Sequence, residues 1–443
     1  MARFLVATVP VPAHTRNALP FVARLVERGH EVRWFAGRRF HHLVTAVGAT
    51  PVTFDLTRDF DGSRLATEFP QLVGARGPAA IGRLYADVLV GDAPARVGDL
   101  RRELAAHPAD AILCDGLSYG VAELGEVLGV PAATFGDGPV PRSHGPTPAY
   151  GPGFLPMRGP LSRLRNHAVR SASRWWVLDE AQRRLDRLRR DLSLPADGRS
   201  VLEASVSRHL HLQGCVPSFE YAADTLPAPV HWVGAIRPDP PPDWAPPPWW
   251  EEVVLGDRPV VHVTQGSIRP DMGELVVPTL RALGGEGALV VVTTGGVPVQ
   301  RLERDLGAAL PPNARVASYV PYDLLLPHVD VCVTNGGYTG VTTALHHGVP
   351  LVQAGSTEEK AEIGARIAWS GVGVRIRATR PSTPRIRSAI STVLADPAYG
   401  AAAARMGEAF RVHDAGREGA DLLERLAAHR RPVTEPVPPV HTR

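Results

Sequence analysis

The chain has 443 residues, 44% of them apolar and 21% charged, and its net charge at pH 7 is only +3. This length exceeds what one hydrophobic core usually serves, so we expect two or more domains. The arginines are spread out, with no dense basic block and no alternation of basic and aromatic residues, which argues against a nucleic-acid partner.

Targeting signals are weak. No uncharged apolar run reaches the about 18 residues of a membrane span, so we expect no membrane partner. The run at residues 4–9 is too short, and its basic region too weak, for a signal peptide. Cys114, Cys215 and Cys332 are widely spaced, which is typical of buried free thiols in a reducing compartment. We therefore expect a cytoplasmic protein.

The first half of the chain alternates strand and helix signals. Strands are predicted at residues 3–9, 31–35, 109–114, 130–135 and 209–213, and helices at 19–28 and 118–128. Residues 142–160, rich in glycine and proline, are predicted to form a loop, and residues 161–190 an arginine-rich helix. This alternation is typical of a parallel, doubly wound sheet.

A proline-rich segment at residues 238–250 (PDPPPDWAPPPWW) separates the halves and favours extended, semi-rigid chain. Beyond it, strands are predicted at 260–264, 288–293, 315–319, 331–333, 350–354 and 372–376, and helices at 273–283, 383–394, 400–410 and 418–428. We predict domains at 1–236 and 251–430, a linker at 237–250 and a disordered tail at 431–443. A ligand is expected between the domains.

One motif carries most of the chemistry. The apolar run 331–333 stops at Thr334-Asn335-Gly336-Gly337, and a helical pattern follows and ends at Gly348. The two glycines let the chain turn sharply and let an anion approach closely. The free N–H groups and the positive dipole end of the new helix would face that anion. The motif predicts a phosphate or diphosphate site.

Several separated segments extend this motif to a whole-chain pattern: ATVPVPAHTRNALPFVARLVERGHEVRWFAGRRF, RPVVHVTQG, VVVTTGG, YVPYDLLLPHVDVCVTNGGYTG, ALHHGVPLV and ARIAWSGVGVRI. In this order they resemble the GT-B glycosyltransferases that use nucleotide sugars, closest to the bacterial natural-product (macrolide/polyketide-type) branch of the UDP-glycosyltransferase superfamily. The resemblance implies two Rossmann-like domains with an interdomain cleft. The first would bind the acceptor and the second the nucleotide sugar, with the last helix packed back on the first domain.

The resemblance also implies a set of donor contacts: Gly266, Ser267, Tyr319, Val320, Asn335, Gly336, Gly337, Thr339, Glu359 and Lys360. Alternative interpretations stay open, since Ser267 could cap an ordinary turn, Tyr319 could be a core aromatic, and Glu358 and Glu362 could be solvent-facing charges at a helix start.

Two positions depart from the family. Asn335 stands where much of the family has histidine, so a neutral hydrogen bond replaces a positive charge. Lys360 stands where many relatives have glutamine, which adds a cation beside the sugar. The donor sugar could therefore differ from plain glucose.

A general base is predicted in the first domain. His14 follows the first strand at the carboxyl edge of the sheet, where α/β sites are built. An imidazole can take a proton from an acceptor hydroxyl near neutral pH, and Asp115, at the end of another strand, could hold the imidazolium. The pair resembles the family's His–Asp dyad. Either residue could instead be a helix cap, and Asp137 and His144 are further polar groups near the cleft.

We therefore predict an inverting glycosyltransferase (hexosyltransferase, EC 2.4 type) that moves a sugar from a UDP- or dTDP-sugar to a hydroxyl of a small hydrophobic natural product. We expect no metal and no cofactor, because no acidic pair follows a strand at the site and the nucleotide sugar is a co-substrate. A nucleotide-sugar epimerase of the same fold and a non-catalytic helper of another glycosyltransferase remain alternatives. The sequence leaves the acceptor, the donor sugar, its base, and the choice between monomer and homodimer open.

Overall fold

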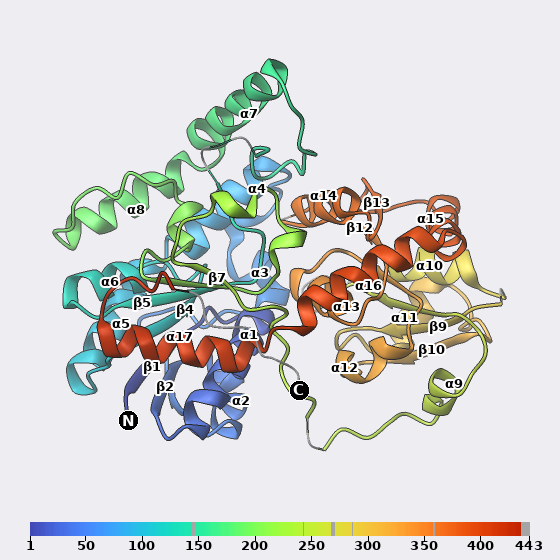
Figure 1. The fold of residues 1–443 in the computed structure, drawn as a ribbon, viewed down its shortest axis with the longest axis horizontal. Helices are drawn as coiled ribbons and strands as arrows, with labels where there is room; N and C mark the ends of the chain where they lie inside the picture. Colours follow the sequence, from blue (N-terminus) through green and yellow to red (C-terminus); the bar gives the residue numbers. More distant parts are fainter. Residues whose placement is uncertain are drawn as a thin grey trace.

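The computed structural model describes residues 1–142, 145, 147–241, 243–266, 271–285, 287–357 and 359–435. Within these residues the chain forms two parallel β-sheets, each packed between helices (Figure 1). The predicted α/β class with two doubly wound sheets is confirmed. The predicted positions Ser267, His144 and Glu358 lie outside the described residues.

The first sheet has the strand order β3-β2-β1-β4-β5-β6-β7. Its strands are β1 (Arg3–Ala7), β2 (Glu31–Phe35), β3 (Thr50–Val52), β4 (Ala111–Asp115), β5 (Ala132–Gly136), β6 (Leu210–Gln213) and β7 (Val230–Trp232). Alternate side chains of β1 enter two different cores, Phe4 and Val6 on one face and Leu5 and Ala7 on the other. Burial on both faces explains the continuous apolar runs of these strands.

The second sheet has the order β10-β9-β8-β11-β12-β13. Its strands are β8 (Val260–Thr264), β9 (Leu289–Thr293), β10 (Ala314–Ala317), β11 (Val331–Thr334), β12 (Leu351–Ala354) and β13 (Gly373–Ile376). Val261 and Val263 pack in one core, and Val260, Cys332 and Leu351 in the other. This sheet is likewise buried on both faces.

Helices lie between these strands along the chain, and the last of them follow β13. They are α1 (Pro12–Glu27), α2 (His41–Ala46), α3 (Leu65–Glu68), α4 (Pro78–Arg83), α5 (Ala93–Ala106), α6 (Val121–Leu128), α7 (Pro160–Ala172), α8 (Asp179–Asp191), α9 (Trp250–Val254), α10 (Val276–Leu283), α11 (Val299–Leu306), α12 (Tyr322–Leu325), α13 (Tyr338–His346), α14 (Lys360–Ser370), α15 (Thr383–Ala395), α16 (Pro397–Arg411) and α17 (Ala415–His429). In the part of the chain that the structure describes, none is long and apolar enough to cross a bilayer.

The first helix begins earlier than predicted. Helix α1 starts at Pro12 rather than near residue 19, with Val11 as its N-cap. Proline suits the first helical position because its fixed φ matches the helix and its missing N–H would have no partner there. The consequence is functional, since His14 lies in the first turn of α1.

The predicted helix at residues 161–190 is interrupted. It consists of α7, a π-helical turn at Ser173–Val177 and α8. Leu178, the N-cap of α8 directly after the π turn, is buried in the core on the Leu5 face of the first sheet. The short edge strands β3 and β7 were not predicted, and Pro51 in β3 weakens the strand signal there.

The end of the chain returns to the first sheet. Helix α17 packs along α1 (Figure 1), and its Leu423 and Leu426 join the first core. Beyond α17, the Val433 N–H donates to the carbonyl of His209, and the Val433 carbonyl lies 2.8 Å from Nε2 of His231. The predicted disorder is therefore wrong for residues 431–435, because these bonds and the burial of Val433 fix that segment. Residues 436–443 lie outside the described range.

Candidate active site

His14 lies between two carboxylates at the carboxyl edge of the first sheet. Its Nδ1 is 2.9 Å from Oδ2 of Asp137 and 3.3 Å from Oδ1 of Asp115. Both distances are within ion-pair range, and the contacts become ion pairs when the imidazole is protonated. Asp115 ends β4 and Asp137 follows β5, so neighbouring parallel strands bring both groups to one imidazole.

The electrostatics of this cluster favour a charged imidazole. Burial alone would lower the pKa of His14, but the two carboxylates outweigh it and hold that pKa well above its ordinary value. Burial pushes the pKa of Asp115 upward, and the contacts of its carboxylate with His14, Ser118 and the Val9 N–H more than offset this. The pKa of Asp115 is therefore lowered, and its carboxylate is ionised at neutral pH.

The capping alternatives for the pair do not hold. The N-cap of α6 is Gly120, not Asp115. The Asp115 carboxylate instead accepts hydrogen bonds from the N–H groups of Val9 and Leu117, both at 2.8 Å. His14 is neither the N-cap of α1 nor a surface residue, because its side chain is only 12% exposed. The predicted pair is thus brought into contact, with Asp137 as an additional partner.

The glycine loop of the second domain has the geometry expected for a close anion approach. Gly336 has φ +96°, and a Cβ there would come within 2.9 Å of Gln353. Gly337 is the N-cap of α13, and no side chain caps this helix. The first turn of α13, which includes Thr339, therefore begins directly at the loop. Gly266, after β8, also has a positive φ of 72°.

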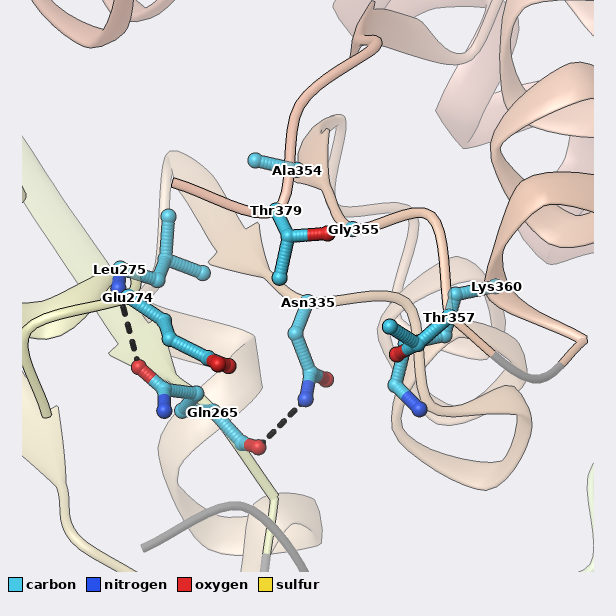
Figure 2. A pocket seen from close by; sticks show the side chains of 9 residues that line it. All are labelled: Gln265, Glu274, Leu275, Asn335, Ala354, Gly355, Thr357, Lys360 and Thr379. Carbon is cyan, nitrogen blue, oxygen red and sulfur yellow. Dashed lines mark hydrogen bonds between the residues drawn. The ribbon is translucent and has the colours of Figure 1, made fainter. Parts of the chain in front are cut away.

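A small pocket lies beside this loop at the ends of β8, β11 and β12 (Figure 2). Its lining residues are Gln265, Glu274, Leu275, Asn335, Ala354, Gly355, Thr357, Lys360 and Thr379. The Asn335 amide donates to the carbonyl of Gln265 at 2.5 Å, which ties the loop to the end of β8. The pocket thus brings Asn335 and Lys360 together, and Lys360 is the only lysine among the chain's 48 lysine and arginine residues.

Tyr319 is not a core aromatic, so that alternative is wrong. Strand β10 ends at Ala317, and the Tyr319 ring is 42% exposed in the following loop. The guanidinium of Arg16, from α1, lies 5.7 Å from the ring centroid. The side chain of the next residue, Val320, is fully buried, which fixes the backbone beside the exposed ring.

Glu359 and Lys360 form the start of α14, as N-cap and first helical residue. The Glu359 side chain lies against Gly138 of the first domain, 3.8 Å from where a Cβ would be. The alternative interpretation of Glu362 as a solvent-facing charge is wrong. Its buried carboxylate accepts from the N–H groups of Gly151 and Gly153 and pairs with Arg366.

The two domains are joined by polar contacts that the sequence did not predict. Asn17 of α1 donates to the hydroxyl of Thr339 at 3.0 Å, and Gln213 of β6 donates to the hydroxyl of Tyr338 at 2.9 Å. Farther out, the buried Arg366 pairs with Glu220 of the first domain at 2.5 Å. The only sequence signal for Asn17 is its position one helical turn after His14. Gln213, Glu220 and Arg366 have no such signal.

Comparisons with known proteins identify the class. A family model described as the C-terminal domain of erythromycin biosynthesis protein CIII-like proteins matches residues 284–426. The 4'-demethylrebeccamycin synthase of Lentzea aerocolonigenes is 39% identical over 426 residues, which cover 96% of this chain and 99% of that protein. UDP-glycosyltransferase 2 of Phaeomoniella chlamydospora is 31% identical, with 96% and 95% covered.

Solved structures share the fold at lower identity. The calicheamicin glycosyltransferase CalG4 has a TM-score of 0.70 and 22% identity, covering 97% of this chain and 99% of that one. The spinosyn rhamnosyltransferase SpnG complexed with thymidine diphosphate has a TM-score of 0.66 and 20% identity, covering 96% and 99%. Fold and relatives together define a GT-B glycosyltransferase. The chain belongs to the bacterial natural-product branch of that family.

Proposed function

We propose that this glycosyltransferase moves a hexose from a nucleoside diphosphate sugar to a hydroxyl of a small hydrophobic acceptor, with inversion at the anomeric carbon. The donor class agrees with the names of relatives, one a UDP-glycosyltransferase and one a rhamnosyltransferase complexed with thymidine diphosphate. The acceptor class agrees with relatives named for rebeccamycin and spinosyn compounds.

The observation that carries the proposal is the hydrogen bond between Asn17 and Thr339. Asn17 lies one turn after His14 on α1, and Thr339 is the second residue of α13, directly after the glycine loop. The predicted base and the predicted anion site therefore stand on helices in direct contact. A sugar bound through its diphosphate at the loop would have its anomeric carbon near His14, as the reaction requires.

In the proposed reaction, Nε2 of His14 takes the proton of the acceptor hydroxyl while that oxygen attacks the anomeric carbon. The bond from this carbon to the diphosphate breaks, and its electron pair leaves with the diphosphate. The proton stays on the imidazolium, which Asp115 stabilises. Attack from the face opposite the leaving group inverts the configuration. The amides and dipole at the start of α13 stabilise the leaving charge.

The remaining donor residues take roles around this centre. The exposed Tyr319 ring offers a face for the base, with the Val320 backbone beside it. Glu359 would accept hydrogen bonds from sugar hydroxyls, and Lys360 would supply the positive charge that the neutral Asn335 lacks. Gly266 and the predicted Ser267 would approach the phosphates.

The test is a panel of UDP- and dTDP-sugars against phenolic, indole and macrolide-like acceptors, with products identified by mass spectrometry and their anomeric configuration by NMR. We expect a transfer product of inverted configuration from the wild type. His14→Gln should lose most turnover while it still binds nucleotide in calorimetry. Conversion of a donor without acceptor would favour the epimerase, and full activity of His14→Gln in a mixed assay would favour the helper.

A further inference from the structure

The imidazole of His14 has a second carboxylate partner that the His–Asp pair does not require. Asp137 is the nearer of the two, at 2.9 Å from Nδ1 against 3.3 Å for Asp115. The Asp137 side chain is 18% exposed and that of Asp115 is fully buried. These two carboxylates are the charged groups that act on His14 in the described structure, one from β4 and one from the loop after β5.

The two carboxylates differ in what else they hold. Asp115 accepts hydrogen bonds from the N–H groups of Val9 and Leu117 and from the hydroxyl of Ser118. Its orientation is thus fixed by the first sheet itself. Among the described residues, His14 is the one ionic partner of the Asp137 carboxylate. Within the described part of the chain, the contact with the His14 imidazole is therefore the structural role that the Asp137 carboxylate shows.

The loop that carries Asp137 is nevertheless held firmly. On one side, a Cβ on Gly136 would lie 2.5 Å from Oε1 of Gln213 and 2.7 Å from Nε2 of His211, so both buried side chains would have to shift to admit any residue other than glycine. On the other side, the Gly138 carbonyl accepts from Nε2 of Gln213 at 3.0 Å. The same Nε2 lies 2.9 Å from the hydroxyl of Tyr338, the first residue of α13. Contact with the donor domain thus helps to fix the loop that presents Asp137.

We propose that Asp137 is a positioning residue that holds the His14 ring at Nδ1, the same atom that its fixed partner Asp115 contacts, and that it shares the charge of the imidazolium during sugar transfer. The role in catalysis rests on the proposed function, whereas the effect on the His14 ring does not. When His14 takes the acceptor's proton, the cluster of one imidazole and two carboxylates changes its net charge from −2 to −1. The raised pKa of His14 agrees with this arrangement of two carboxylates around one imidazole.

The first experiment measures the His14 ring directly, without substrate. Protein labelled with ¹³C-histidine is titrated by NMR, with the His14 signal assigned through His14→Gln. Asp137→Asn should lower the pKa of His14 by about one unit or more, because a charge within hydrogen-bond distance is removed. Asp137→Glu keeps the charge and should retain most of the shift. Asp305→Asn, on α11 in the other domain, controls for the loss of one carboxylate at a distance.

The second experiment is the pH profile of kcat/KM. In Asp137→Asn the acidic limb of the kcat/KM profile should move to lower pH together with the pKa of the His14 ring. The ratio of variant to wild-type kcat/KM should therefore rise as pH falls. A merely structural role would lower activity by the same factor at every pH. An unchanged His14 pKa in Asp137→Asn, or a uniform loss across pH, overturns the proposal. If the His14 pKa shifts in Asp137→Asn but no sugar transfer is found, the proposed function fails, whereas the role of Asp137 in holding the His14 ring stands.

Discussion

Replacing Gly337 by alanine separates a ligand contact from a folding effect. Gly337 has φ −63° and ψ 130°, which alanine adopts freely. An added Cβ would have the Asn335 Oδ1 as its nearest neighbour, at 4.0 Å. The protein therefore has room for the methyl group, and the loss of a favourable N-cap should cost about 1 kcal/mol at most.

The cost to a bound diphosphate should be larger. The methyl group would project from the loop where phosphate oxygens must approach the amides at the start of α13. Loss of one hydrogen bond to a charged group costs about 1.5–3 kcal/mol, which corresponds to a roughly 10- to 150-fold weaker Kd. Calorimetry with UDP and dTDP measures this change, and thermal denaturation without ligand measures the folding cost.

Gly340→Ala is the matched control on the same helix. Its Cβ would meet only the Tyr322 ring, at the ordinary contact distance of 3.6 Å. Alanine is the better helix former at this third position of α13, so stability should hold or rise. We expect near wild-type nucleotide binding in Gly340→Ala and weakened binding in Gly337→Ala. Equal Kd values for Gly337→Ala and wild type would refute the reasoning.

Three further predictions concern other parts of the account. The raised pKa of His14 contributes folding stability that is fully present below the unfolded pKa of about 6.5 and is lost as pH rises through the raised folded pKa. As pH rises through this range, the denaturant midpoint of unfolding should therefore fall less in His14→Gln than in the wild type. Arg366→Met leaves the carboxylates of Glu220 and Glu362 buried without their cation and should cost about 3–5 kcal/mol in denaturant unfolding, with partial recovery when Glu220→Gln is added. Amine-selective acetylation should modify Lys360 and the α-amine alone, and bound donor should slow only the reaction at Lys360. The first prediction fails if the denaturant midpoint depends on pH equally in His14→Gln and wild type. The second fails if Arg366→Met unfolds at the wild-type denaturant concentration. The third fails if bound donor does not slow acetylation of Lys360.

Much of the fold followed from the sequence because buried parallel strands are continuous apolar runs. Strands such as β8 and β9, with every residue buried, leave a signal that chain-local reasoning can find. The boundaries were less accurate. Helix α1 was predicted to start too late, because its first turn reads as a proline-rich loop unless Pro12 is taken as a helix start. The edge strand β3 is short and contains proline.

The candidate site was predicted where its residues follow a strand or open a helix. His14, Asp115 and the loop at Asn335 to Gly337 all have this position, and the first two are in contact in the structure. Contacts between the two domains could not be predicted, because no local sequence pattern specifies which helix of one domain packs against which helix of the other. Asn17 and Thr339 are 322 positions apart and meet only in the folded chain.

Charge alone was a poor guide to exposure. Glu362 has the position of a surface charge at a helix start, yet it is buried and pairs with Arg366. Its burial depends on Gly151 and Gly153, which come from a distant loop of the first domain. Tyr319 shows the reverse case, an aromatic next to a strand that stays exposed. Both outcomes are set by tertiary packing, which a single sequence does not encode locally.

The most direct test of the central claim is to observe the backbone amides at the start of α13 while a nucleotide binds. In ¹⁵N-labelled, deuterated protein, TROSY spectra recorded during a titration with UDP or dTDP report each amide separately. We predict that the largest shifts fall on Gly336, Gly337, Tyr338 and Thr339. Saturating nucleotide that leaves these four amides unmoved while shifting others would contradict the account.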